Sequence, residues 1–219
     1  AQYSFAPVRR EASHRMPASH LFVVASSGVP AEQGAGDRER YNRLSLLVRY
    51  LLDEWNRITG GSNTSLARAA GSTPDAPARL RALAARECPD FGAQSLVRRL
   101  DQFLLESFEL VPAAGTAFDA GAWDALGALT ERSQRAAEEW LGNQVPETSA
   151  LARSARELGA VAASSFGAGF GGSVWALVPA TDAADFANRW SVRYAEEQPS
   201  AATHAEFLVS RAGPGAHAW

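Results

Sequence analysis

Residues 164–178 read SSFGAGFGGSVWALV, a glycine-rich segment that leads into a short apolar run. Four of its residues lack a Cβ: Gly167, Gly169, Gly171 and Gly172. Such a backbone is free to adopt positive φ and to approach another backbone or an anion closely. The spacing is not a dinucleotide fingerprint, because a strand rather than a helix follows, and the GK[ST] ending of a Walker A loop is absent. Taken alone, the segment fits a tight connection between strands as well as it fits a phosphate-approaching loop.

Outward from this loop, the sequence predicts helices that separate a few non-adjacent strands. Short apolar or β-branched runs bounded by turn residues predict strands at residues 21–26, 160–164, 174–178 and 206–210. Apolar residues at helical spacing predict helices at residues 37–58, 64–70, 94–110, 121–141, 148–158 and 182–194, with a further helix after Pro74. This order of elements is typical of an α+β layer structure. Because the apolar residues of the strand at 21–26 are contiguous, we expect both of its faces to be covered.

Composition and charge exclude several classes of protein. The chain has 219 residues, of which 46% are hydrophobic, and 21 basic against 24 acidic residues give a formal net charge of −3. No apolar run approaches the roughly 18 residues that a membrane-spanning helix needs. The near-balanced charge provides no basic surface for nucleic acid or anionic lipid. We therefore expect neither a nucleic-acid partner nor a membrane partner.

Residue usage adds three expectations. All 21 basic residues are arginine, which removes any lysine-based mechanism. Cys88 is the only cysteine, so an intramolecular disulfide is impossible and a cytoplasmic location is expected. The chain begins with Ala1 and its one methionine is Met16, which indicates a processed chain or a piece of a longer protein.

Other reactive side chains form no catalytic or metal-binding pattern. Ser164 and Ser165 are not surrounded by a G-x-S-x-G elbow. No two of the four histidines have metal-ligand spacing, and no carboxylates form a signature pair. We expect no metal site from these residues.

A second informative stretch is residues 22–45, in which a strand delivers a polar loop and then a helix start. That start presents Tyr41, Asn42 and Arg43. A phenol and an amide there can hydrogen-bond sugar hydroxyls. From the spacing alone, however, the favoured interpretation is an ordinary first turn with Tyr41 packed on the core. A third stretch, residues 142–160, places Pro146 just ahead of a helix. We interpret it as an ordinary helix start with a structural role.

Together, these stretches resemble the C-terminal half of a galactokinase, in the GHMP small-molecule kinase superfamily. The resemblance is carried by FVVASSGV at residues 22–29, YNRL at 41–44, PET at 146–148 and the segment 159–178. It spans residues 21–178, and GAGFGG before an apolar strand is its most specific part. It implies a GHMP kinase C-terminal-type domain, with a few-stranded antiparallel sheet covered by several helices.

The resemblance also implies a function. ATP, with Mg2+, would supply the γ-phosphoryl group for transfer to a sugar hydroxyl, converting galactose to galactose 1-phosphate. Tyr41 matches the family's sugar-contacting tyrosine. Residues 167–172 match the motif that packs beside the phosphate-binding loop, so their four glycines are expected to support that loop.

Several family features have no counterpart here: the sugar-binding arginine motif, the phosphate-binding helix start and the catalytic aspartate. We therefore expect no catalytic residue in this chain. The resemblance implies that a missing N-terminal domain is its partner and binds most of the ATP and Mg2+, so the chain alone would be inactive. The expected organisation is a lead-in over residues 1–20 with one edge strand around 3–8, the GHMP-type domain over 21–211 and a flexible tail over 212–219.

Departures from the family pattern leave the substrate open. The helix start reads YNRLSLL where galactokinases place arginines and an acidic residue, and RRLDQFLLES replaces a histidine-bearing segment. The alternatives are another GHMP kinase acting on arabinose or an amino-sugar, a galactokinase-like sensor without chemistry, and a self-standing α+β interaction module.

Overall fold

The computed structural model describes residues 1–31, 35–86 and 88–213. The chain forms two compact units. Unit 1 comprises Ala1–His14, Gln33–Thr116 and Arg135–Asn143, and unit 2 comprises Arg15–Glu32, Ala117–Gln134 and Gln144–Trp219. Residues 214–219, most of the tail expected to be flexible, lie outside the described part.

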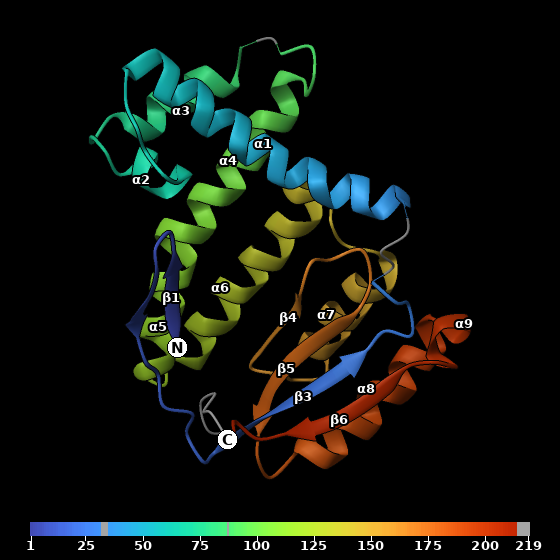
Figure 1. Cartoon of the computed structure of the whole chain (residues 1–219). Helices are drawn as coiled ribbons and strands as arrows, with labels where there is room; N and C mark the ends of the chain where they lie inside the picture. The colour runs from blue at the N-terminus through green and yellow to red at the C-terminus, as the bar shows by residue number, and fades with distance from the viewer. Residues whose placement is uncertain (32–34, 87, 214–219) are drawn as a thin grey trace, which may run out of the picture. The chain divides into compact units, whose positions relative to one another are not determined.

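Unit 2 is built on a four-stranded antiparallel sheet (Figure 1). Its strands, in spatial order, are β4 (Ala162–Phe166), β5 (Ser173–Pro179), β3 (His20–Ser26) and β6 (Glu206–Ser210). Two helices, α7 (Pro146–Glu157) and α8 (Ala183–Glu197), pack on the sheet, and the short α9 (Pro199–Ala202) follows α8. The predicted α+β fold, an antiparallel sheet covered by helices, is confirmed.

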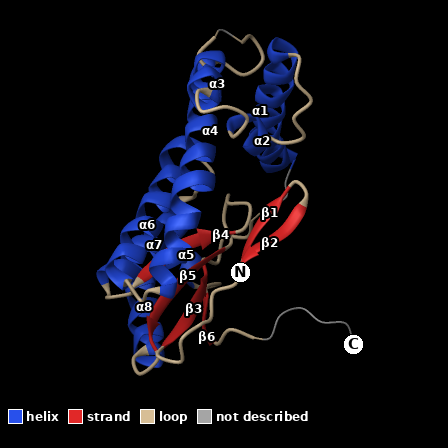
Figure 2. Cartoon of the chain, turned by 90° about the vertical axis from the view of Figure 1, so that its left-hand side faces the viewer, coloured by secondary structure: helices blue, strands red, loops and turns tan. Residues whose placement is uncertain are grey.

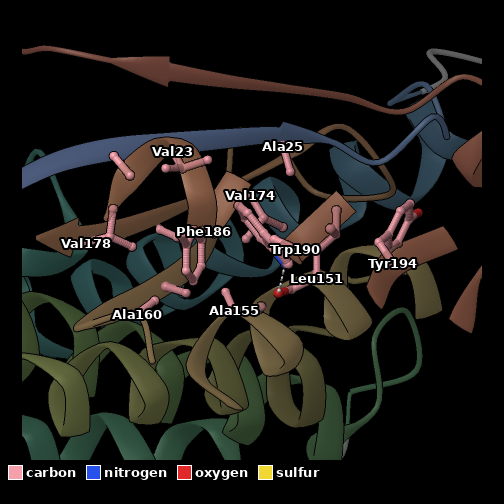
Figure 3. Close-up of a cluster of buried hydrophobic side chains, with 14 residues drawn as sticks. Val23, Ala25, Leu151, Ala155, Ala160, Val174, Val178, Phe186, Trp190 and Tyr194 are labelled. Atoms are coloured by element: carbon pink, nitrogen blue, oxygen red, sulfur yellow. Dashed lines mark hydrogen bonds between the residues drawn. The ribbon is translucent and has the colours of Figure 1, made fainter. Parts of the chain in front are cut away.

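The pleat of the sheet separates two apolar faces. Val23 and Ala25 of β3 lie opposite Ala176 and Val174 of β5, and all four are buried in the core with α7 and α8. In this core the indole N–H of Trp190 donates to the Leu151 carbonyl at 3.2 Å (Figure 3).

The alternate residues form the second face of the sheet. Phe22 and Val24 of β3 are half-buried there. They lie opposite Leu177 and Trp175 of β5 and help to line an apolar cavity of about 430 Å³. The expectation that both faces of this strand are covered therefore holds fully for one face only, because the cavity leaves the other partly open.

Unit 1 is mainly helical, with a separate two-stranded ribbon (Figure 2). The ribbon pairs β1 (Gln2–Phe5) with β2 (Val8–Ala12), so the first residues form a hairpin rather than the single edge strand expected. The core packs α1 (Ala35–Thr59), α2 (Leu66–Ala70), α3 (Ala76–Ala84) and α4 (Ala93–Leu105) through apolar residues that include Leu51, Trp55 and Leu100.

Two helices contain π-helical turns. After α4 the chain continues through η1 (Glu106–Leu110) into α5 (Val111–Asp119), and α6 (Trp123–Ala136) continues into η2 (Ala137–Leu141). The prediction that the 94–110 helix ends at residue 110 is wrong, because the chain stays helical through Pro112. The widened turn before Pro112 relaxes the helical ladder where proline lacks an N–H donor. In the described part, no helix combines the length and apolarity that crossing a bilayer requires.

Candidate functional site

The glycine-rich loop connects β4 to β5 within unit 2. Its four glycines all have positive φ: Gly167 at 93°, Gly169 at 85°, Gly171 at 124° and Gly172 at 88°. Phe170 also has a positive φ, of 60°, which a non-glycine residue adopts only when its surroundings hold it there. Each of the four glycines therefore adopts the positive φ that the sequence led us to expect.

The loop lies directly against residues 27–31, which follow β3. The Ser27 amide donates to the Gly172 carbonyl at 2.9 Å, and the Gly172 amide donates to the Val29 carbonyl at 2.8 Å. A Cβ added at Gly171 would lie 2.6 Å from the Pro30 carbonyl oxygen, closer than real Cβ atoms come to such an atom. The two backbones meet in a way that only glycine permits at position 171.

A buried side chain of α6 holds the start of the loop. The amide oxygen of Gln134 accepts from the Ser165 backbone N–H at 2.9 Å and from the hydroxyls of Ser164 and Ser165, each at 3.1 Å. These serines are therefore anchors for the loop in the structure rather than a nucleophile pair. Sequence reasoning missed Gln134, although a glutamine two turns beyond the buried Leu126 was an available signal.

A buried phenol on α8 holds Ser27, the residue that contacts the glycine-rich loop. The Tyr194 hydroxyl of α8 donates to the Ser27 carbonyl at 2.7 Å, and both residues are fully buried. Burial, with a smaller contribution from the Glu147 carboxylate, raises the pKa of Tyr194 to about 12. The phenol therefore remains a protonated donor throughout the neutral range. The sequence offered no signal for this contact beyond a tyrosine on the apolar face of the helix.

The chemistry that the loop can supply is donation of hydrogen bonds. Among the residues that the structure describes, no acceptor pairs with the backbone amides of Gly167, Gly169 and Gly171. Backbone N–H groups that lack a protein acceptor can donate hydrogen bonds to an anion. The same groups repel a cation, so this loop fits phosphate oxygens and does not fit Mg2+ as a ligand. The described residues also include no group of three His, Cys, Asp or Glu side chains placed to hold a metal ion.

Tyr41, the predicted sugar contact, lies in unit 1 on α1, where 50% of its surface is exposed. The interpretation favoured by the spacing, an ordinary first turn with Tyr41 packed on the core, is therefore wrong. Its neighbour Arg43 donates to the Phe91 carbonyl at 3.1 Å and stacks on the Phe91 ring, so this arginine serves the packing of unit 1. The structure thus brings the four glycines together and places Tyr41 in the other unit.

Part of the chain matches the model of a known protein family. Residues 115–196, which include α7, β4, the glycine-rich loop, β5 and nearly all of α8, match the family model of the GHMP kinases C-terminal domain. The predicted resemblance to this superfamily of small-molecule kinases is therefore confirmed over these residues.

The chain is also similar to solved structures of small-molecule kinases. Galactokinase from Lactococcus lactis, solved with galactose, matches with a TM-score of 0.67 and 23% identity, covering 90% of this chain and 46% of the galactokinase. Mevalonate kinase from L. major, solved with R-mevalonate, matches with a TM-score of 0.46 and 14% identity, covering 96% of this chain and 46% of that kinase. No curated protein sequence matches the chain. The fold is thus that of the C-terminal part of a galactokinase, and the chain spans about half the length of these kinases.

Proposed function

We propose that the chain is the C-terminal part of a galactokinase-like sugar kinase, which transfers the γ-phosphoryl group of ATP to a sugar hydroxyl. The observation that carries the proposal is the glycine-rich loop, with its run of positive φ, its unpaired amides and its close approach to residues 27–31. Phosphoryl transfer depends mainly on positioning and on stabilising negative charge, and a rigid set of backbone donors contributes to both.

The roles proposed for the individual residues are those that the resemblance to galactokinases implies. The loop of Gly167, Gly169, Gly171 and Gly172 supports the phosphate-binding site, and Tyr41 contacts the sugar through its phenol. Catalytic groups, most of the ATP contacts and the coordination of Mg2+ are assigned to an N-terminal domain, which is the partner of this chain. The organisation proposed for the chain is a lead-in over residues 1–20, the domain over 21–211 and a tail over 212–219, in a cytoplasmic protein.

Galactose is the proposed substrate because the matching structure of the same fold is a galactokinase solved with galactose. The unusual helix start around Tyr41 is a specific reason to keep a second sugar, arabinose or an amino-sugar, as the alternative. A non-catalytic sensor remains the second class.

The test is ATP-dependent phosphorylation by the full-length protein against a panel of galactose, arabinose and amino-sugars. Formation of galactose 1-phosphate with the highest kcat/KM supports the proposal, while higher turnover of another sugar selects the alternative. Galactose binding without turnover of any sugar would identify a sensor. The 219-residue chain alone, assayed in parallel, is expected to show no transfer.

A further inference from the structure

One residue, Ser27, connects the core of unit 2 to the glycine-rich loop. Ser27 bonds in two directions: its N–H donates to the Gly172 carbonyl, and its carbonyl accepts from the Tyr194 phenol. The Ser27 hydroxyl also donates to the Val29 carbonyl at 3.2 Å and accepts from the Val29 amide at the same distance. Residues 27–29 therefore form a short rigid turn that faces the loop on one side and Tyr194 on the other.

The far end of this connection is immobilised by packing. The Tyr194 ring lies edge-on to Phe207 of β6, with ring centroids 6.2 Å apart. One turn earlier, the Trp190 indole N–H of α8 donates to the Leu151 carbonyl of α7 at 3.2 Å (Figure 3). It also donates to the Ser154 hydroxyl of α7 at 3.2 Å. A phenol fixed this firmly sets the position of the carbonyl that it holds.

At the loop end of this connection, Gly171 and Gly172 have little freedom to move relative to residues 27–30. Gly172 exchanges hydrogen bonds with Ser27 and Val29, and Gly171 lies against the Pro30 carbonyl with no room for a Cβ. A small shift of residues 27–30 would therefore move the loop backbone with it.

We propose that Tyr194 is a positioning residue for the glycine-rich loop: through Ser27, its phenol sets the orientation of the loop amides that face the nucleotide phosphates. The inference rests on the proposed function for its catalytic consequence. Its structural part, the coupling of Tyr194 to Gly172, stands on the hydrogen bonds alone.

The structural part is tested in the 219-residue chain by amide hydrogen exchange of Tyr194→Phe. This change removes one hydroxyl and keeps the ring. We expect the amides of Ser27 and Gly172 to exchange about tenfold faster, as the loss of one buried hydrogen bond implies. Phe186→Leu, in the same core and in ring contact with Trp190, is the control for general loss of stability. If Tyr194→Phe accelerates these two amides no more than Phe186→Leu does, the coupling is absent and the inference is overturned.

The catalytic part is tested in the full-length kinase. Tyr194→Phe is expected to lower kcat about tenfold and to leave the KM for sugar within twofold, since the loop serves the phosphates. Tyr50→Phe, which removes a phenol bonded to Cys88 in unit 1, is expected to keep wild-type kcat. Faster exchange at Gly172 with wild-type kcat would overturn the phosphate role of the loop and leave the coupling intact. Normal exchange with a lowered kcat would overturn the coupling and leave the proposed function intact.

Discussion

The two units bury different kinds of residues. Of the buried polar side chains in the described part, His20, Ser27, Gln134, Thr148 and Ser154 lie in unit 2, and only Asn143 lies in unit 1. The main buried cluster of unit 1 consists of Leu, Ala, Trp and Cys side chains. Apolar packing tolerates small shifts, whereas a buried polar group needs its partner at a fixed distance and angle. Unit 2 is therefore the part of the molecule in which single hydrogen bonds determine local geometry, and it contains the glycine-rich loop.

The sharpest test of this difference compares two glycines of the loop. Gly171→Ala places a Cβ 2.6 Å from the Pro30 carbonyl, whereas Gly167→Ala adds one where nothing lies within 4 Å. Both have positive φ, so both variants carry strain of about 1–2 kcal/mol. We expect Gly171→Ala to lower kcat of the full-length kinase about 100-fold or more, and Gly167→Ala about tenfold, because only the former displaces residues 27–30. Equal effects in steady-state assays would show that the contact with Pro30 is unimportant.

The second test removes the anchor on α6. Gln134→Leu leaves the Ser165 amide and two hydroxyls without their shared acceptor. We expect a loss of about 1–3 kcal/mol in the free energy of unfolding, measured by urea denaturation. Gln94→Leu, at an exposed position of α4, is the matched control and should change stability by less than about 0.5 kcal/mol. Similar values for the two variants would mean that the loop does not depend on this polar anchor.

A third test addresses unit 1, where the proposed contribution comes from an exposed side chain. Tyr41→Phe is expected to raise the KM for sugar about three- to tenfold, the effect of one lost hydrogen bond, and to leave the KM for ATP unchanged. The half-exposed position predicts no measurable change in thermal stability. A variant with wild-type sugar KM would remove Tyr41 from the site.

The smallest expected effect is a pH dependence in unit 2. His20 is buried, its ring lies tilted against Trp123 with ring centroids 4.3 Å apart, and its Nδ1 forms a hydrogen bond with the Ser19 hydroxyl. Burial lowers its pKa below the ordinary 6.5, so the unfolded chain binds the proton more readily than the folded chain. The neutral ring's contribution is present above the unfolded pKa and is lost as the pH falls through about 6.5 and below. In the His20→Gln variant, the melting temperature should decrease less between pH 7 and 5.5 than in the wild type. An unchanged decrease would show that other groups cause it.

Local features of the sequence predicted much of the fold. Helical spacing of leucines predicted α1, and the run of glycines predicted where the backbone would adopt positive φ, because both depend on neighbouring residues. The anchors were not predictable in this way. Gln134 and Ser165 are 31 residues apart, and Tyr194 and Ser27 are 167 apart, so nothing near either residue indicates its partner. The predicted helix end at residue 110 was premature because the π-helical turn Glu106–Leu110 is not visible in the apolar pattern.

The strand order has a consequence for how this protein is made. β3 lies near the start of the chain, yet both of its neighbours, β5 and β6, come from the last quarter. During synthesis the apolar β3 therefore leaves the ribosome long before either partner exists, and the four-stranded sheet is complete only when β6 has emerged. Such non-local pairing slows folding and leaves strand edges open to association with other chains. The nascent protein is most exposed to misassembly while the helices of unit 1 are being synthesised, and a stop codon before residue 206 would leave one edge of β3 permanently unpaired.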